Sequence, residues 1–255
     1  MEEIPFSNKL QEALKEQILA TQKATPGPHY AAFDADGTLW DSDLGEQFFQ
    51  YQIDHCNLAK LKGVDPWDYY LTTKEVDPVK AYLWLAQISE GVPLAQVREW
   101  AKECVEKKGA RIFQSQKKWI QWLQSQNIEV FIVTASIQWA VEPAGELVGI
   151  PFENVIGIQT QIDDKGVVTS DLKGVVTWRD GKAKAILERT QGVRPIFCSG
   201  NTYGDIALLE TSVGARLSIQ TQSEPNSLFE EENKLLVHAQ KMNWPVHHFF
   251  QDLES

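Results

Sequence analysis

The sequence is short of cysteine and of positive charge, and each shortage excludes classes of protein. The three cysteines, Cys56, Cys104 and Cys198, lie far apart without a CxxC pair, so they indicate neither a disulfide framework nor a zinc site. Lysine and arginine number 24 against 35 aspartates and glutamates, and the formal net charge is −11. Such a charge excludes the electrostatic footprint of a DNA- or RNA-binding protein. We expect reduced cysteines and no nucleic-acid partner.

Long hydrophobic runs are also missing from the sequence. No stretch of 18 consecutive apolar residues occurs, and the apolar runs that do occur are short, such as residues 130–135. The chain opens with an acidic and then amphipathic segment, without the basic start and apolar block of a secretory signal. We therefore expect a cytoplasmic protein with no membrane partner, provided that Met1 is the natural start.

The hydrophobic content is sufficient for a core that contains both helices and strands. With 255 residues and 43% hydrophobic content, the chain can form one large domain or one domain with a substantial insertion. Residues 7–23 have apolar positions at helical spacing, which predicts a lead-in helix that TPGP at 25–28 ends. The pattern is helical from about 42 to 125, and NIEVFIVTAS at 127–136 then predicts a strand buried on both faces.

Strand and helix patterns alternate in the second half of the chain. Helices are predicted at about 138–148, in DGKAKAILERT and in TYGDIALLETS; strands are predicted in NVIGIQT, VRPIFCSG and GARLSIQ, the last being the final core strand. IDDKGVVTSDLKGVVTW predicts a small β-hairpin insertion with turns at Lys165-Gly166 and Lys173-Gly174. The predicted fold class is therefore α/β, a Rossmann-like doubly wound parallel sheet formed by residues 1–41 and 126–255, with an all-helical cap at 42–125.

Polar side chains follow three of the predicted strands, where the ligand crevice of an open parallel sheet lies. They are Asp34 and Asp36 after the first strand, Thr134, Ala135 and Ser136 after the second, and the segment SGNTYGD at 199–205 after a later one. Lys182, at the start of a predicted helix, adds a cation. Carboxylates, hydroxyls, glycine-exposed amides and one cation together suit the binding of a phosphoryl group.

Four strings in this order, DADGTLW, TAS, GKAKAI and GNTYGD, resemble the four motifs of the haloacid dehalogenase (HAD) superfamily of aspartyl phosphatases. A D-x-D-G-T string alone would occur by chance in roughly one such chain in a thousand. The resemblance extends from about residue 30 to 220, and the helical block resembles the C1 cap of that family. More loosely, the first motif and the cap resemble the phosphoserine and phosphorylcholine phosphatase branches.

The resemblance implies a role for each motif residue. Asp34 is the expected nucleophile, which forms a phosphoaspartate, and Asp36 is the expected general acid and later base. As an acid, Asp36 needs a pKa above the reference of about 3.9, which we expect burial or the negative charge of the phosphate and Asp34 to provide. The other implied residues are Thr134 and Lys182 for catalysis and Ala135 and Ser136 for substrate binding. Capping of the next helix is the competing interpretation for Thr134 and Ser136, and Lys184 is an alternative to Lys182.

Two carboxylates that face a phosphate dianion would repel it, so we expect Mg²⁺ as the cofactor. By the resemblance, its ligands are Asp34, the backbone carbonyl of Asp36, and Asn201 and Asp205 of the fourth motif. Asn201 departs from the acidic residue that is commoner at this position. An amide carbonyl can still ligate Mg²⁺, but it carries one negative charge fewer.

Aromatic residues are concentrated in the predicted cap, in DPWDYY and AYLWLAQ. They fit either a packed cap core or an aromatic cage for a quaternary ammonium, and Tyr70 is a candidate substrate-binding residue. Glu46 lies near the position where such relatives place a carboxylate for the substrate's amine, so it is a further candidate substrate-binding residue. Arg98 and Arg111 fit either binding of a substrate carboxylate or a solvated helix face.

The sequence thus predicts an enzyme, a Mg²⁺-dependent phosphomonoester hydrolase. Its expected partner is a small phosphorylated metabolite similar to phosphoserine or phosphocholine. A phosphomutase and a binding module with a weakened metal site remain alternatives. A dehalogenase is disfavoured because displacement of halide needs no proton donor at Asp36. The sequence decides neither the substrate nor the oligomeric state.

Overall fold

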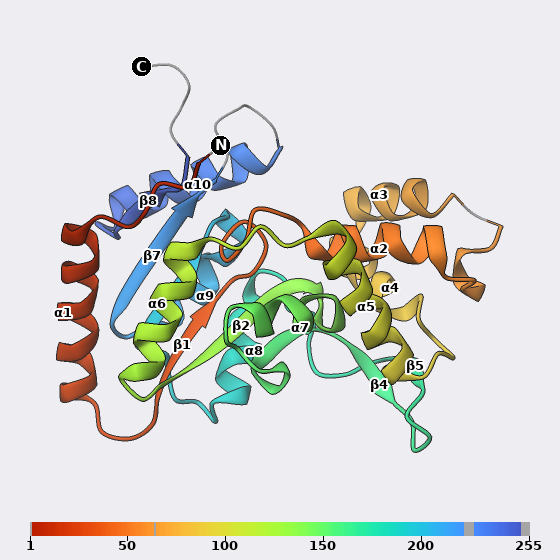
Figure 1. The fold of residues 1–255 in the computed structure, drawn as a ribbon, viewed down its shortest axis with the longest axis horizontal. Coiled ribbons are helices and arrows are strands. Elements are labelled where there is room, and N and C mark those ends of the chain that lie inside the picture. The colour runs from red at the N-terminus through yellow and green to blue at the C-terminus, as the bar shows by residue number, and fades with distance from the viewer. Residues whose placement is uncertain (1, 64, 222–226, 251–255) are drawn as a thin grey trace.

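A six-stranded parallel sheet carries the fold in the computed structural model, which describes residues 2–63, 65–221 and 227–250 (Figure 1). The strands lie in the order β3-β2-β1-β6-β7-β8, and every neighbouring pair is parallel. They are β1 (His29–Phe33), β2 (Ile128–Ile137), β3 (Val155–Ile158), β6 (Phe197–Gly200), β7 (Ala215–Gln220) and β8 (Val246–His248). The chain runs outward from β1 in both directions, which confirms the predicted doubly wound α/β sheet.

Helices cover both faces of the sheet because successive strand residues point to opposite sides. Ala31 and Phe33 join one buried cluster, with residues of α1, α6 and α7. Ala32 joins another, with residues of α8, α9 and α10. These helices are α1 (Asn8–Ala24), α6 (Gln114–Ser125), α7 (Gln138–Leu147), α8 (Asp180–Arg189), α9 (Ile206–Thr211) and α10 (Ser227–Lys241).

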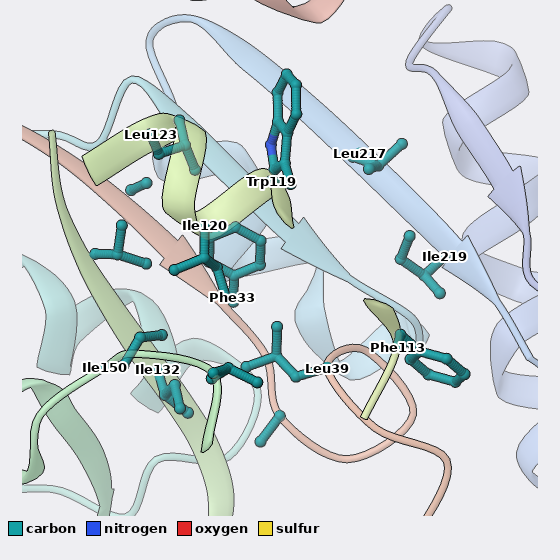
Figure 2. Packing of buried hydrophobic residues seen from close by; sticks show 14 of the residues in the cluster. Phe33, Leu39, Phe113, Trp119, Ile120, Leu123, Ile132, Ile150, Leu217 and Ile219 are labelled. Atoms are coloured by element: carbon teal, nitrogen blue, oxygen red, sulfur yellow. The ribbon is translucent and has the colours of Figure 1, made fainter. Parts of the chain in front are cut away.

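Helix α6 belongs to the sheet layer rather than to the cap (Figure 2). The indole of Trp119 lies 5.8 Å from the ring of Phe197, which in turn lies 5.3 Å from Phe33. Ile120 and Leu123 are fully buried in the same cluster. The predicted cap of residues 42–125 therefore includes a helix that packs on the sheet. We propose a cap of residues 42–109 instead, because helical periodicity in a sequence reveals a helix but not its packing partner.

In its described residues, 42–63 and 65–109, the proposed cap has four α-helices, and they gather at one end of the molecule (Figure 1). They are α2 (Leu44–His55), α3 (Pro66–Val76), α4 (Pro78–Gln87) and α5 (Leu94–Lys108), with a 3₁₀ turn at Ala59–Leu61. The ring of Phe49 lies 4.8 Å from Trp67, 5.6 Å from Tyr70 and 5.7 Å from Trp84. These aromatic residues pack against one another, so they form the hydrophobic core of the cap.

The predicted hairpin is present and ties the cap to the sheet domain. Strands β4 (Thr160–Ile162) and β5 (Val168–Leu172) are antiparallel. The loop before α5 pairs with this hairpin through bonds of 2.9 Å from Gly91 N to Val168 O, from Val168 N to Val92 O and from Leu94 N to Gly166 O. The cap is thus anchored at the hairpin.

The strand predicted at residues 214–220 is present as β7, but the prediction that it is the last core strand is wrong. Strand β8 extends the sheet beyond β7. His247 packs edge-to-face against Phe6 and Phe249, with ring centroids 4.6 and 4.7 Å away. Three residues are too few to produce a strand pattern in the sequence. In the part of the chain that the structure describes, no helix has the length and apolar character needed to span a bilayer.

Candidate active site

Four polar residues meet at the carboxyl ends of β1 and β6. Three follow these strands, and the fourth lies in the first turn of α8. Asp34 directly follows β1, and its backbone N–H donates to Ser199 O of β6 at 2.9 Å. Asn201 follows β6, Asp205 ends the 3₁₀ turn Tyr203–Asp205, and Lys182 lies on α8. We call Asp34, Lys182, Asn201 and Asp205 the catalytic floor; each is at most 6% exposed.

Lys182 joins the two carboxylates of the catalytic floor. Its Nζ lies 2.5 Å from Asp34 Oδ1 and 2.5 Å from Asp205 Oδ1. Burial, and secondly the charge of Asp205, raise the pKa of Asp34 to about 7, while Lys182 opposes this shift. Burial disfavours the ammonium form of Lys182, but Asp205 and Asp34 outweigh it and raise the pKa of Lys182. The structure thus brings Lys182, rather than Lys184, against the expected nucleophile.

The loop after Asp34 packs tightly against Asn201. Gly37 has a φ of +74°, and a Cβ at this position would lie 2.1 Å from Asn201 Nδ2. A glycine is therefore required for both conformation and space. Thr38 Oγ1 lies 3.1 Å from Asp34 Oδ2 and 3.3 Å from Asn201 Oδ1. The Thr38 hydroxyl consequently lies between the nucleophile and the Asn201 carbonyl.

Asp36 is held by three donors at the start of the cap. Trp40 Nε1 and Leu44 N donate to Oδ1 at 2.8 and 2.9 Å, and Ser136 Oγ donates to Oδ2 at 2.7 Å. Burial raises the pKa of Asp36 despite these donors, which favour the carboxylate form. The expected rise in pKa is therefore present, and burial is its largest cause. A raised pKa is what a general acid needs.

The last residues of β2 line the same edge. Thr134, Ala135 and Ser136 lie inside this strand, which runs to Ile137, and not after it as the sequence predicted. Thr134 Oγ1 accepts from Ser136 N at 3.0 Å, and the Thr134 carbonyl accepts from Thr177 Oγ1 at 2.5 Å. Ala135 lies between them in the strand. The N-cap of α7 is Ile137, and no side chain of a described residue caps this helix. The structure therefore gives no support to helix capping by Thr134 or Ser136.

The cap contributes a charged and aromatic group that we call the cap wall: Glu46, Lys74 and Tyr82. Lys74 Nζ lies 3.5 Å from Glu46 Oε1 and 5.5 Å from the centre of the Tyr82 ring. It also lies 5.1 Å from the ring of Tyr70, which is itself only 1% exposed. The pKa of Tyr82 is raised by burial, and the charges of Lys74 and Lys182 oppose the rise. The Tyr82 hydroxyl is therefore influenced by the charge of Lys74 in the cap wall and by the charge of Lys182 in the catalytic floor.

The two arginines considered as substrate ligands lie elsewhere. Arg98 forms a bidentate pair with fully buried Glu142, at 2.7 and 2.9 Å, and both line a cavity of about 910 Å³ between α5, α7 and the hairpin. Arg111 Nη1 lies 3.1 Å from Asp41 Oδ2, and its guanidinium stacks on Phe250. Both side chains thus have structural partners.

The catalytic floor has the donor chemistry of a magnesium site. Asp34 and Asp205 supply buried carboxylate oxygens and Asn201 an amide carbonyl, which are the hard ligands that Mg²⁺ prefers. No group of three or more His, Cys, Asp or Glu side chains is arranged to hold a metal among the described residues. The set therefore relies on an amide and, as the resemblance implies, on the carbonyl of Asp36. With Lys182 as the only cation in the catalytic floor, a net negative charge remains for a divalent ion to balance.

Comparison with known proteins gives the family. A model of the haloacid dehalogenase-like hydrolases matches residues 31–210. The chain belongs to the haloacid dehalogenase-like hydrolases. The prediction of an enzyme, a hydrolase with phosphatases among its relatives, is therefore confirmed.

Three similar proteins illustrate the range of the family. Phosphorylcholine phosphatase from Pseudomonas aeruginosa is 24% identical, with 68% of each chain covered. A functionally unknown protein from Anaerococcus prevotii has a similar structure, with a TM-score of 0.70, 14% identity, and coverage of 96% of this chain and 92% of its own. A phosphoserine phosphohydrolase-like protein from Francisella tularensis has a TM-score of 0.55, 16% identity, and coverage of 86% and 94%. The two structures share the HAD fold with this chain.

Two charged residues of this HAD hydrolase were missed by the sequence prediction. Lys74 of α3 contacts Glu46 of α2 and Tyr82 of α4, and no local sequence pattern encodes such contacts between helices. Glu232, on α10, lies against Asn201 but outside the four HAD motifs. A signal for Glu232 does exist, because helical spacing places it on the same stripe as Leu235 and Ala239.

Proposed function

We propose that this HAD hydrolase hydrolyses phosphomonoesters of small metabolites through a phosphoaspartate on Asp34. One observation carries the proposal: Asp34 is buried and held by Lys182 and Thr38 at a strand end, with the raised-pKa carboxyl of Asp36 two residues on. A fixed nucleophile beside a candidate acid is the minimum that two in-line displacements need.

The reaction has two displacements. In the first, a carboxylate oxygen of Asp34 bonds to phosphorus, the bond to the ester oxygen breaks, and Asp36 gives its proton to the leaving alkoxide. In the second, water bonds to phosphorus and loses a proton to Asp36, and the bond between phosphorus and Asp34 breaks. We assign the binding of phosphate oxygens to Lys182, Thr134, the amide of Ala135 and the hydroxyl of Ser136, which lie at this edge.

In the proposed mechanism, Mg²⁺ would compensate the negative charges of the carboxylates and the phosphate. We expect Asp34, the carbonyl of Asp36, Asn201 and Asp205 to hold it, and its charge would let a phosphate dianion approach the two carboxylates. A cation beside Asp34 would also lower its pKa and so favour the nucleophilic carboxylate.

The cap wall supports a substrate that carries both an ammonium and a carboxylate. Glu46 and Lys74 present opposite charges 3.5 Å apart, and each side chain is more than a third exposed. The Lys74 ammonium already lies over the rings of Tyr70 and Tyr82, where a quaternary ammonium would bind. A phosphoserine-like substrate can pair with both charges, whereas phosphocholine would have to displace Lys74. We therefore favour the phosphoserine-like class.

The test is release of inorganic phosphate from phosphoserine, phosphocholine, phosphoethanolamine, sugar phosphates and p-nitrophenyl phosphate, with and without Mg²⁺. We expect Mg²⁺-dependent release, with phosphoserine preferred over phosphocholine. Asp34→Asn should abolish turnover, because an amide is not a nucleophile for phosphorus. Retention of more than a few per cent of the wild-type kcat by this variant would overturn the covalent mechanism.

The same assay separates the alternatives that the sequence left open. A phosphomutase would transfer the phosphoryl group between positions with no net release of phosphate. A binding module would bind a phosphometabolite without turnover. Higher kcat/KM for phosphocholine than for phosphoserine would replace the proposed substrate class but leave the phosphatase proposal intact.

A further inference from the structure

Glu232 is a fully buried carboxylate directly behind the fourth motif. It shares the buried stripe of α10 with Leu235 and Ala239, and all three residues are 0% exposed. A charged side chain is rarely found in such a position unless it is paired and hydrogen-bonded. The family match ends at residue 210, so the matched motifs do not account for it.

Thr221 and Asn201 donate hydrogen bonds to this carboxylate. Thr221 donates its backbone N–H to Oε2 at 2.9 Å and its hydroxyl to Oε1 at 2.6 Å. Asn201 donates its side-chain amide to Oε1 at 3.0 Å. Acceptance of three hydrogen bonds compensates an ionised carboxylate for its burial. Glu232 therefore links α10 to the catalytic floor through Asn201.

This contact decides which way the Asn201 side chain faces. An ionised carboxylate only accepts hydrogen bonds, so Asn201 turns its NH₂ group toward Glu232 and its carbonyl the other way. The carbonyl Oδ1 lies 3.3 Å from Thr38 Oγ1, which contacts Asp34. Gly37 leaves the space that the amide occupies. The Asn201 carbonyl is thus presented on the side of the nucleophile.

Glu232 also adds a charge to the catalytic floor. Asp34, Asp205 and Lys182 together carry a net charge of −1 when all are ionised. Asn201 adds none, whereas an acidic residue at this position would add one. Glu232, one hydrogen bond away, brings the buried group to −2, which matches a divalent cation.

We propose that Glu232 is a positioning residue for the Mg²⁺ site: it orients the Asn201 carbonyl and supplies the negative charge that Asn201 lacks. This inference rests on the proposed function, because it assumes a cation between Asp34 and Asn201. It deepens that function by assigning a role to a residue beyond the four motifs. It also accounts for the departure at Asn201, since the charge is moved to a neighbouring side chain.

The experiment measures the Kd for Mg²⁺ by isothermal titration calorimetry on the full chain. We expect Glu232→Gln to raise the Kd about 10–100-fold, the usual cost of losing a group that orients a metal ligand. Asn201→Asp should lower the Kd, because bound Mg²⁺ would relieve the repulsion of two adjacent carboxylates. The double variant Asn201→Asp/Glu232→Gln restores the charge and should bind Mg²⁺ no more weakly than wild type.

Glu231→Gln is the matched control, since Glu231 lies on the same helix and pairs with Lys234 at the surface. Its Kd should stay within about twofold of wild type. Melting temperatures without Mg²⁺ separate loss of folding from loss of affinity. If Glu232→Gln does not fold, the Kd values of Asn201→Asp and of the double variant are compared instead. That comparison still tests whether the charge of residue 232 contributes to Mg²⁺ binding.

Two outcomes overturn the inference in distinguishable ways. If wild type binds Mg²⁺ and the Kd is the same in wild type, Glu232→Gln and the double variant, Glu232 has only a structural role and the proposed phosphatase stands. If wild type neither binds Mg²⁺ nor depends on it for turnover, the metal part of the proposed function fails and this inference fails with it.

Discussion

The catalytic floor pairs a lysine with two carboxylates and the cap wall pairs a lysine with one, but the two groups differ in burial and in the distances between their charges. In the catalytic floor, Lys182 contacts Asp34 and Asp205 at 2.5 Å, and the three side chains are at most 8% exposed. In the cap wall, Lys74 lies 3.5 Å from Glu46, and their side chains are 36% and 37% exposed. Burial makes the first group electrostatically strong, whereas solvent screens the second.

The difference separates chemistry from recognition. A buried group with fixed partners is preorganised, so it can stabilise a reacting phosphoryl group without rearrangement. A solvent-screened ion pair costs little free energy to break. Glu46 and Lys74 can therefore separate, and each can pair with an opposite charge on the substrate. Substitutions in the catalytic floor or at Asp36 should therefore reduce all reactions, while substitutions in the cap wall should change the preference among substrates.

Of the substitutions that test this difference between chemistry and recognition, we expect Asp36→Asn to have the largest effect on kcat. Asp36→Asn should lower kcat by about 10²–10⁴-fold for an alkyl phosphate, the usual scale of general acid–base catalysis. The asparagine can still accept from Trp40 and Leu44 through its carbonyl, so the local fold should persist. Steady-state kinetics with phosphoserine measures the loss.

The control for Asp36→Asn is p-nitrophenyl phosphate, whose leaving group needs no protonation. Its first displacement should lose much less rate than that of phosphoserine, as measured by the burst of nitrophenolate. A loss below tenfold for phosphoserine would remove Asp36 from the role of acid.

The second prediction concerns the stability of the sheet domain in acid. Burial lowers the pKa of His247 to about 4, and its ring packs against Phe6 and Phe249. The unfolded chain takes up this proton near pH 6.5, before the folded protein does. Stability from neutral His247 is therefore complete above pH 6.5 and is lost as the pH falls toward 4, by about 3 kcal/mol.

His247→Gln isolates this contribution, because glutamine can also donate to the carbonyl of Ile4, which His247 Nε2 contacts at 2.9 Å. Carboxyls with raised pKa values, such as Asp34, titrate in both proteins and cancel in the difference. Urea unfolding at pH 7 and pH 4 gives that difference. If wild type and His247→Gln lose the same stability between pH 7 and pH 4, His247 is not the source of the acid sensitivity.

The sequence predicted those parts of the site that depend on strand ends. Asp34 and Asn201 each follow a recognisable apolar strand, and Thr134 lies near the carboxyl end of another. Parallel strands end at one edge, so their proximity follows from topology. Lys182 needed the motif as well, because a lysine at the start of a helix is usually solvated.

The remaining features depend on contacts between distant segments. Periodicity identified α6 as a helix, but only its packing on Phe197 assigns it to the sheet domain. Strand β8 is too short to show a pattern, and the contact of Lys74 with Glu46 joins residues that are 28 positions apart in the sequence. Long-range packing is not encoded in any local window of sequence, so these features emerged only from the structure.

The smallest predicted effect on kinetics comes from substitutions in the cap. It tests whether the cap binds the leaving group of the substrate. Glu46→Gln removes one charge of the cap wall and should lower kcat/KM for phosphoserine about tenfold, roughly 1.4 kcal/mol, relative to p-nitrophenyl phosphate. Tyr70→Phe removes the hydroxyl beside Lys74 but keeps the ring that packs on Phe49, so its effect on the same ratio should be smaller, about threefold.

Phenylalanine is the informative substitution at position 70, because alanine would leave a cavity in the cap core and so confuse recognition with folding. The ratio between substrates is the decisive quantity, since damage to the cap as a lid would lower every kcat/KM together. If Glu46→Gln and Tyr70→Phe lower kcat/KM equally for phosphoserine and p-nitrophenyl phosphate, the cap wall does not bind the leaving group, and the ion pair of Glu46 with Lys74 only joins α2 to α3.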